Sequence, residues 1–258
     1  MAGSTLYFKQ AGQGTPLVLI HGLFGSLENL GAIARQLAEN FCVYSLDLPN
    51  HGRSPRVENM SLASMAGDLL AWLDEQGLPQ VHLLGHSLGG KVAMELALRH
   101  PERVKSLVVL DIAPVSYPPH HNDVFAGMFA LEPQRLQSRS EADQKMQPHV
   151  PEAAVRSFLL KNLVREPEGG FAWRMNLPVI HRDYAQLIAS NRADAIFNGN
   201  TLFIKGGNSD YLQEKYRDQI MARFPKATIK IVPDTGHWLH AEKPDLVARL
   251  VKQFLLTA

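Results

Sequence analysis

Short apolar runs alternate with amphipathic stretches along most of the chain, and this alternation limits the fold more than any other feature. Apolar runs with the length of buried strands lie at residues 17–22, 42–48, 81–87, 104–112, 201–207 and 228–234, and "TLYFKQ" (5–10) is a candidate first antiparallel strand. Helical spacing of apolar residues occupies 30–40, 61–77, 88–100, 211–224 and 244–258. Parallel strands need helical crossovers of this kind. The pattern therefore predicts a doubly wound α/β sheet covered on both faces.

One stretch breaks the alternation. Residues 115–184 contain no strand-like run of the same strength, only helix-like pieces at 122–132 and 151–164. Because a structureless loop of that length is uncommon in a compact domain, we expect an inserted helical cap at 115–185. The core then consists of 1–114 and 186–258. We expect the large apolar side chains of the cap to form mainly its own small core; these are Phe125, Met128, Phe129, Phe158, Leu159, Trp173 and Met175.

Charge and composition exclude several kinds of partner. The chain has 26 Lys and Arg against 25 Asp and Glu, so no overall field attracts nucleic acid or an anionic membrane. Its one cysteine, Cys42, lies in an apolar stretch and has no partner for an internal disulfide. The N-terminus lacks a secretion-type apolar segment, and no run is long enough to span a membrane. We expect a cytoplasmic protein, either a monomer or a small homo-oligomer.

Ser87 is the first candidate for chemistry. It lies in "GHSLG" (85–89), a G-x-S-x-G pattern between an expected strand and an expected helix. Small neighbours at Gly85 and Gly89 let strand and helix approach at a sharp turn, and the helix N-terminus favours a nearby oxyanion. The pattern alone also fits a small residue in a tight turn, so other residues must decide.

A nucleophilic serine needs a base. His237, in "PDTGHWLHAEKP", follows the last expected strand in a loop at the carboxyl edge of the sheet. His240 is its nearest rival, and we expect that residue to pack or to face solvent.

Four segments in order, "LIHGLFGS", "DLPNHGRSP", "GHSLGGK" and "GHWLHAEKP", resemble the α/β-hydrolase superfamily and, within it, YbfF-type bacterial esterases. "LDIAPVSY" and "KGGNS" strengthen this resemblance. It implies a mostly parallel eight-stranded sheet with a small helical cap inserted after strand 6. It also implies a serine carboxylesterase that acts on small-molecule acyl esters, with acyl thioesters as a second substrate class. The small insert, with its mixed aromatic and aliphatic residues, suggests a bounded apolar pocket, so we expect short acyl chains.

The acid that orients the histidine departs from the usual superfamily pattern, which is a G-x-x-D turn after the next-to-last strand. In "FIKGGNSDYL" that position falls on Ser209 when counted from Gly206 and on Asp210 when counted from Gly207. Asp111, in "VVLDIAP" after the nucleophile helix, keeps the order Ser, Asp, His. YbfF-type esterases resemble this arrangement, and we favour Asp111 over Asp210. The other interpretation of Asp111 is a cap at the start of the insert.

An oxyanion hole needs two backbone N–H groups. The residue after the nucleophile, Leu88, supplies one. For the second, the resemblance of "HGLFGS" to the superfamily's HG-x turn points to Leu23, with Phe24 as the alternative. We expect His51, in "NHGRS", to be structural.

Other chemistries have less support. No nucleotide-binding glycine motif and no metal-ligand spacing is present, so we expect no metal and no organic cofactor. Two alternatives to the esterase stay open. One is a carbon–carbon hydrolase or elimination enzyme similar to the hydrolase-fold synthases of menaquinone assembly, and the other is a non-enzymatic small-molecule binder.

Overall fold

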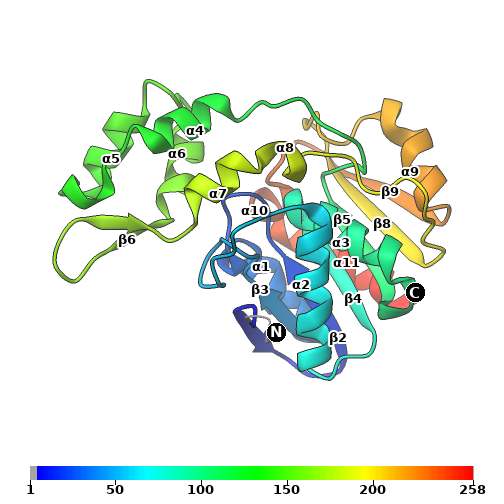
Figure 1. Ribbon diagram of the computed structural model, residues 1–258. Coiled ribbons are helices and arrows are strands. Elements are labelled where there is room, and N and C mark those ends of the chain that lie inside the picture. Colours follow the sequence, from blue (N-terminus) through cyan, green and yellow to red (C-terminus); the bar gives the residue numbers. More distant parts are fainter. Residues whose placement is uncertain (1–4, 258) are drawn as a thin grey trace.

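A twisted, mostly parallel sheet runs through the centre of the molecule (Figure 1). The computed structural model describes residues 5–257. Its strands are β1 (Phe8–Ala11), β2 (Thr15–Ile20), β3 (Phe41–Leu46), β4 (Val81–His86), β5 (Val104–Leu110), β8 (Asn200–Gly206) and β9 (Ala227–Val232). Their order is β1-β3-β2-β4-β5-β8-β9, and β1 is antiparallel to β3. The predicted α/β class and the candidate first strand are confirmed.

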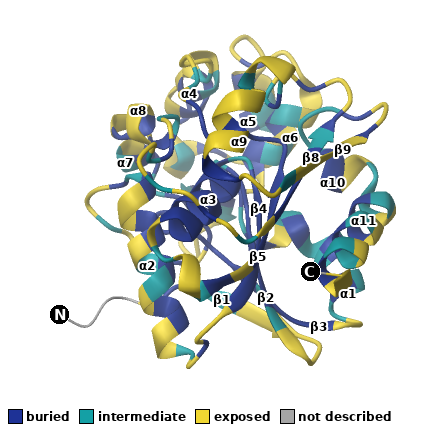
Figure 2. Ribbon diagram, turned by 90° about the vertical axis from the view of Figure 1, so that its right-hand side faces the viewer, coloured by how far each residue is buried: buried dark blue, intermediate teal, exposed yellow. Residues whose placement is uncertain are grey.

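Helices cover both faces of the sheet. The helices α1 (Gly31–Leu37) and α11 (Pro244–Thr257) bury one apolar cluster, and α2 (Leu62–Glu75), α3 (Leu88–Arg99) and α9 (Arg217–Arg223) bury the other. Shorter elements are η1 (Leu27–Leu30), η2 (Pro101–Arg103), η4 (Glu214–Tyr216) and α10 (Leu239–Glu242). The central strands are almost wholly buried (Figure 2). Burial on both faces explains why these strands are continuous apolar runs.

The segment between β5 and β8 forms a lobe to one side of the sheet (Figure 1). It contains α4 (Asn122–Phe129), η3 (Pro133–Arg135), α5 (Arg139–Met146), α6 (Ala153–Leu160), α7 (Leu177–Arg182) and α8 (Tyr184–Leu187). A short hairpin of β6 (Leu163–Arg165) and β7 (Phe171–Trp173) was not predicted, because three-residue strands are too short to show alternation. We call 115–185 the cap; these boundaries stay a prediction.

Two details differ from the expectation. Within the described residues the main sheet has seven strands instead of eight, and the cap follows the fifth strand in chain order instead of the sixth. At the N-terminal side, β1 is the edge strand of the described sheet, and it turns through Gly12 and Gly14, both with positive φ, directly into β2.

Lys91 of α3 joins the first residue of the cap to the segment that follows the cap. Its buried Nζ donates hydrogen bonds to the carbonyl oxygens of Val115 and Ala189, each at 2.7 Å. Burial lowers the pKa of Lys91 to about 7, whereas the two carbonyl acceptors favour its charged form.

Among the described residues, no helix is long and apolar enough to cross a membrane.

The turn from β4 into α3 requires glycine. A Cβ on Gly85 would lie 2.2 Å from the Gly89 carbonyl oxygen, and one on Gly89 would lie 2.3 Å from the Ile20 oxygen. Backbone atoms cannot move aside as a flexible side chain does, so the turn holds strand and helix at one fixed separation.

We predict that Gly85→Ala lowers the free energy of unfolding by about 3 kcal/mol, at the upper end of ordinary overpacking. Gly67→Ala is the matched control: no atom lies within 4 Å of its added Cβ. Because Gly67 lies inside α2, alanine there should raise stability by about 0.5–1 kcal/mol. Urea unfolding followed by circular dichroism measures both. A Gly85→Ala protein as stable as the wild type would contradict the tight turn.

Candidate active site

Ser87 occupies the turn between β4 and α3 in a conformation that few non-glycine residues adopt. Its φ is 52° and its ψ is −119°. The Ser87 N–H donates to the carbonyl oxygen of Leu110 at 3.0 Å, which ties the turn to the end of β5. On the other side Gly22 comes so near that a Cβ there would lie 3.2 Å from the Ser87 Cβ. Neighbouring backbone thus holds the strained serine at the carboxyl edge of the sheet.

His237 lies in the loop after β9 and contacts Asp111. Its Nδ1–H donates to Asp111 Oδ2 at 2.8 Å. The Asp111 side chain is fully buried, while that of His237 is 23% exposed. This hydrogen bond leaves Nε2 of His237 available on the side of the cavity that Ser87 also lines. No hydrogen bond between Ser87 Oγ and His237 is present among the described residues, and such bonds often form only with substrate bound.

Three donors converge on the Asp111 carboxylate, two from the end of β8 and its following loop and one from the loop after β9. Besides His237, the Gly206 N–H donates to Oδ1 at 3.0 Å, and the Ser209 hydroxyl donates to Oδ2. Asp111 itself has φ 54° and donates its N–H to Ile204 of β8 at 2.9 Å. Only β8 separates β5 from β9 in the sheet. The carboxyl ends of these parallel strands lie at one edge, so Asp111, just after β5, reaches His237 in the loop after β9.

The structure therefore brings Asp111, and not Asp210, to His237. Asp210 is exposed, and within residues 5–257 no hydrogen bond or ion pair joins its side chain to His237. Ser209, at the usual acid position, is buried and donates to the acid instead.

The ring of Tyr211 stacks on His237, with centroids 3.9 Å apart and planes at 21°. The carbonyl oxygen of His237 accepts from His86 Nε2 at 2.9 Å. This bond ties the loop to the end of β4. Sequence reasoning missed both residues; the only available signal was their position beside the recognised motifs.

His240 packs instead of serving as base. It is buried, its ring lies 4.2 Å from that of His86, and burial lowers its pKa to about 3. Burial, with the neighbouring imidazoles, also lowers the pKa of His86 well below its usual value. Both rings therefore stay neutral near pH 7.

The two oxyanion candidates in the turn after β2 differ in what their amides contact. The Phe24 N–H donates to His51 Nε2 at 3.3 Å, whereas the Leu23 N–H has no acceptor within the described part of the chain. Burial lowers the pKa of His51 to about 3, so its Nε2 stays unprotonated and can accept. The Leu88 N–H, at the first residue of α3, has no intrahelical acceptor. Leu23 and Leu88 thus carry the two free amides beside Ser87.

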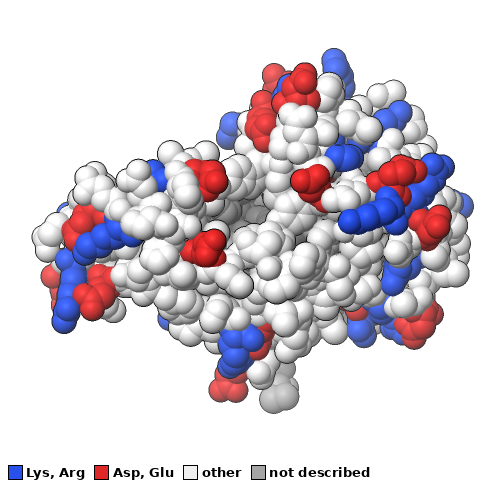
Figure 3. All heavy atoms as spheres, turned by 90° about the horizontal axis from the view of Figure 1, so that it is seen from above, with Lys and Arg blue, Asp and Glu red and all other residues white. Residues whose placement is uncertain are grey.

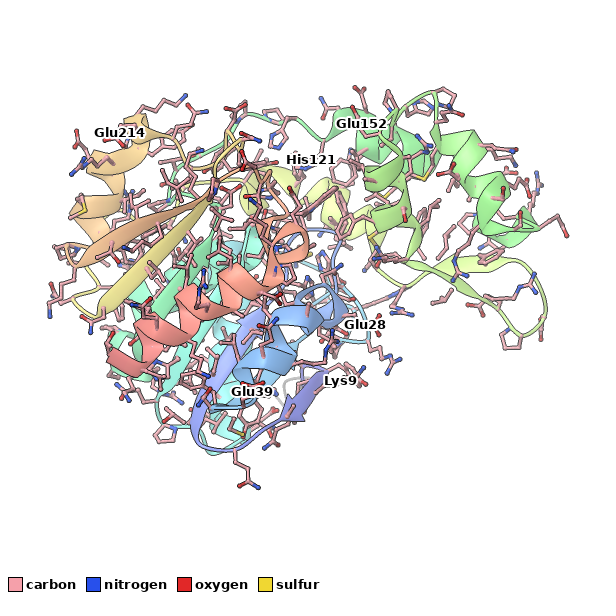
Figure 4. The ribbon with its side chains drawn as sticks, turned by 180° about the vertical axis from the view of Figure 1, so that it is seen from behind. Lys9, Glu28, Glu39, His121, Glu152 and Glu214 are labelled. Atoms are coloured by element: carbon pink, nitrogen blue, oxygen red, sulfur yellow. The ribbon has the colours of Figure 1, made fainter. Side chains whose placement is uncertain are left out.

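A cavity of about 110 Å³ opens over Ser87 and His237. Its apolar side chains come from both core and cap and include Val124, Val155, Phe158, Leu159, Leu187 and Ile188. Seen from above, uncharged atoms border most of the hollow between the lobe and the main body (Figure 3). His121 lies where the first segment of the cap meets the core, and burial lowers its pKa to about 3 (Figure 4).

The prediction that the large apolar side chains of the cap form mainly a small core of their own is wrong. Phe125, Met128 and Met175 are buried in an apolar cluster that the cap shares with the core, and Trp173 packs against that cluster. Phe158 and Leu159 reach the cavity, and Phe129 is exposed. Within residues 5–257 no group of three or more His, Cys, Asp or Glu side chains is arranged to hold a metal ion. The expectation of a cofactor-free site stays a prediction.

Comparisons with known proteins agree with this geometry. The chain is 41% identical over 242 residues to Esterase YbfF of Escherichia coli (strain K12), with 93% of each chain covered. It is 40% identical over 247 residues to sn-1-specific diacylglycerol lipase ABHD11 of Mus musculus, covering 93% of this chain and 80% of that one. A solved structure described as a marine microorganism esterase superposes with a TM-score of 0.95 at 35% identity, covering 97% of this chain and 99% of that one.

A family model described as alpha/beta hydrolase fold matches residues 15–244, which include Ser87, Asp111 and His237. Together with the strand order, the serine turn and the similarity to esterases over nearly the whole chain, this match shows that the chain belongs to the α/β-hydrolase fold family.

Proposed function

We propose that this protein is a serine carboxylesterase that hydrolyses short-chain acyl esters through Ser87, His237 and Asp111. At the coarser level it is an enzyme that hydrolyses ester bonds in small molecules, as its esterase and lipase relatives support. One observation carries the finer proposal: a buried carboxylate holds His237 by Nδ1 at the mouth of a cavity that a strained serine also lines.

In the proposed reaction, His237 Nε2 takes the Ser87 proton as Oγ attacks the acyl carbon. The carbonyl oxygen becomes an oxyanion that accepts from the Leu23 and Leu88 amides. His237 then donates its proton to the departing alcohol, which leaves an acyl-serine. Water attacks that ester with His237 again as base, and the carboxylic acid leaves. Asp111 keeps the Nδ1 proton in place and stabilises the imidazolium throughout.

The lining of the cavity favours a short acyl group. Its walls are mainly apolar side chains from core and cap, which suit a small alkyl chain beside Ser87. Thioesters present the same carbonyl carbon to Ser87 and stay in the proposal as a second substrate class.

The two alternatives make different demands on the site. A carbon–carbon hydrolase or elimination enzyme of the menaquinone-synthase type would use the same three residues on another bond. A small-molecule binder would need neither the Asp111–His237 hydrogen bond nor the strained serine.

A fluorophosphonate probe tests the nucleophile. We expect one covalent adduct, located on Ser87 by peptide mass spectrometry, and turnover of p-nitrophenyl acetate. Ser87→Ala should abolish the adduct and lower kcat by about 10³-fold or more, while Ser140→Ala on exposed α5 should change neither. An unlabelled Ser87 without ester turnover would exclude the esterase.

Paired substitutions test the acid. Asp111→Asn should lower kcat by about 10³-fold or more, because an amide at this position no longer fixes the imidazole tautomer. Asp210→Asn, on an exposed side chain, should stay within about twofold of the wild type. Thermal unfolding of both variants controls for folding. A large loss confined to Asp210→Asn would make Asp210 the acid.

The neutral state of His51 predicts a pH dependence of stability. Its pKa is about 3 when folded and 6.5 when unfolded, so the unfolded chain binds more protons below pH 6.5. The contribution of neutral His51 to the free energy of unfolding is fully present above about pH 6.5 and is lost progressively as the pH falls toward 3. From pH 7.5 to 5, His51 should account for about 2 kcal/mol of the lost free energy of unfolding.

His51→Gln keeps an acceptor for the Phe24 N–H but cannot titrate. Its free energy of unfolding should therefore fall less between pH 7.5 and 5, as urea unfolding at the two pH values measures. Equal losses in variant and wild type would mean that His51 takes up a proton within the folded protein.

A further inference from the structure

Phe24 holds an unfavourable backbone conformation beside Ser87. Its φ is 59°, in the left-handed region that non-glycine residues rarely enter. It is the third residue of a four-residue turn that the Gly25 N–H closes on the Gly22 oxygen at 3.0 Å. A positive φ at that position usually needs glycine, and forcing another residue there costs about 1–3 kcal/mol. Surrounding contacts must hold it.

The cap supplies several of those contacts. Asn162, at the end of α6, donates from Nδ2 to the Phe24 carbonyl oxygen at 2.8 Å. The Phe24 ring packs edge-on against Phe125 at 5.2 Å and His121 at 5.9 Å, both from the cap. Among residues 5–257, the one core residue that bonds the backbone of Phe24 is His51, at the Phe24 N–H.

The turn from Gly22 to Gly25 also sets the direction of the Leu23 N–H group. The Gly22 carbonyl and the Leu23 N–H belong to one planar trans peptide and point in opposite directions. The Gly22 oxygen accepts from the Gly25 N–H and, at 2.8 Å, from His21 Nδ1. The bond from Gly25 requires the turn to be closed with Phe24 at positive φ, whereas the bond from His21 restrains the Gly22 oxygen from the core side.

We propose that Asn162 is a positioning residue through which the cap sets the oxyanion hole: its hydrogen bond to the Phe24 oxygen keeps the Leu23 N–H directed at the reacting carbonyl. The Asn162 side chain is itself held, by a second bond from Nδ2 to the Leu159 oxygen at 3.2 Å. It is 5% exposed, so water replaces its bond to Phe24 poorly. A cap displaced from the core would leave Ser87, His237 and Asp111 in place but lose one oxyanion donor. This inference rests on the proposed function.

Asn162→Ala tests the coupling against Asp183→Ala. Asp183 also joins cap to core, by accepting from the Met60 N–H at 2.7 Å, but it does not line the cavity over Ser87. Removing a direct oxyanion donor costs about 10²–10³-fold in kcat, so misdirecting one should cost about 10-fold or more. We expect this loss for Asn162→Ala with KM for p-nitrophenyl acetate changed less than about threefold.

A trifluoromethyl ketone separates this role from a purely structural one, because its adduct with Ser87 carries an oxyanion. Its inhibition constant should rise in Asn162→Ala by the same factor as kcat falls. Asp183→Ala should lower the melting temperature while changing kcat and the inhibition constant less than about twofold. Asn162→Leu, of similar size but without the donor, should behave as Asn162→Ala and serves if the alanine variant does not fold.

Two results overturn the inference while the proposed function stands. One is an active wild type with unchanged kcat in both Asn162 variants. The other is a fall in kcat without matching weakening of the ketone. A wild type that neither turns over the ester nor binds the ketone would instead overturn the proposed function and this inference with it.

Discussion

The carboxylate of Asp111 is the interaction on which the arrangement of the site depends. A fully buried charge must be compensated, and three donors from two segments do so: the Gly206 amide and the Ser209 hydroxyl at the end of β8, and His237 Nδ1 in the loop after β9. The same oxygens that need compensation therefore join the ends of β5 and β8 to the loop after β9. The position of His237 follows from satisfying this one charge, because a displaced loop would leave the carboxylate short of a donor.

Because Asp111 follows β5, the loop after β8 has a different role from the one it has in the common superfamily pattern. In the common pattern that loop carries the carboxylate, whereas here it carries Ser209, which donates a hydrogen bond to a carboxylate from the neighbouring strand. Adjacent parallel strands end at the same edge of the sheet, so either strand can deliver an acid to the histidine. Tyr211, two residues after Ser209, then covers the exposed face of His237. The loop supports the imidazole from two directions.

The features that the sequence predicted are those with local causes. The strands appear because both faces of the sheet are buried, the Ser87 turn because Gly85 and Gly89 permit backbone contact, and the Ser61 start of α2 because its hydroxyl accepts from the Ser64 amide. The hairpin of β6 and β7, the stacking of Tyr211 and the reach of Asn162 to Phe24 depend on segments that meet only after folding. No periodicity marks such contacts. The resemblance to a family placed Asp111 and Leu23, which spacing alone could not distinguish from Asp210 and Phe24.

Three of the non-glycine residues with positive φ, Phe24, Ser87 and Asp111, lie at the site, and each is held by bonds to a different part of the chain. Ser87 is tied to β5 by Leu110, Asp111 to β8 by Ile204, and Phe24 to the cap by Asn162. The first two restraints lie within the sheet, where parallel strands on both sides resist movement. The third crosses from the core to a lobe outside the main sheet. Local opening begins where fewest buried contacts must break. The turn from Gly22 to Gly25, to which we assign one oxyanion donor in our proposal, is therefore the part of this site whose geometry we expect to depend most on the position of the cap.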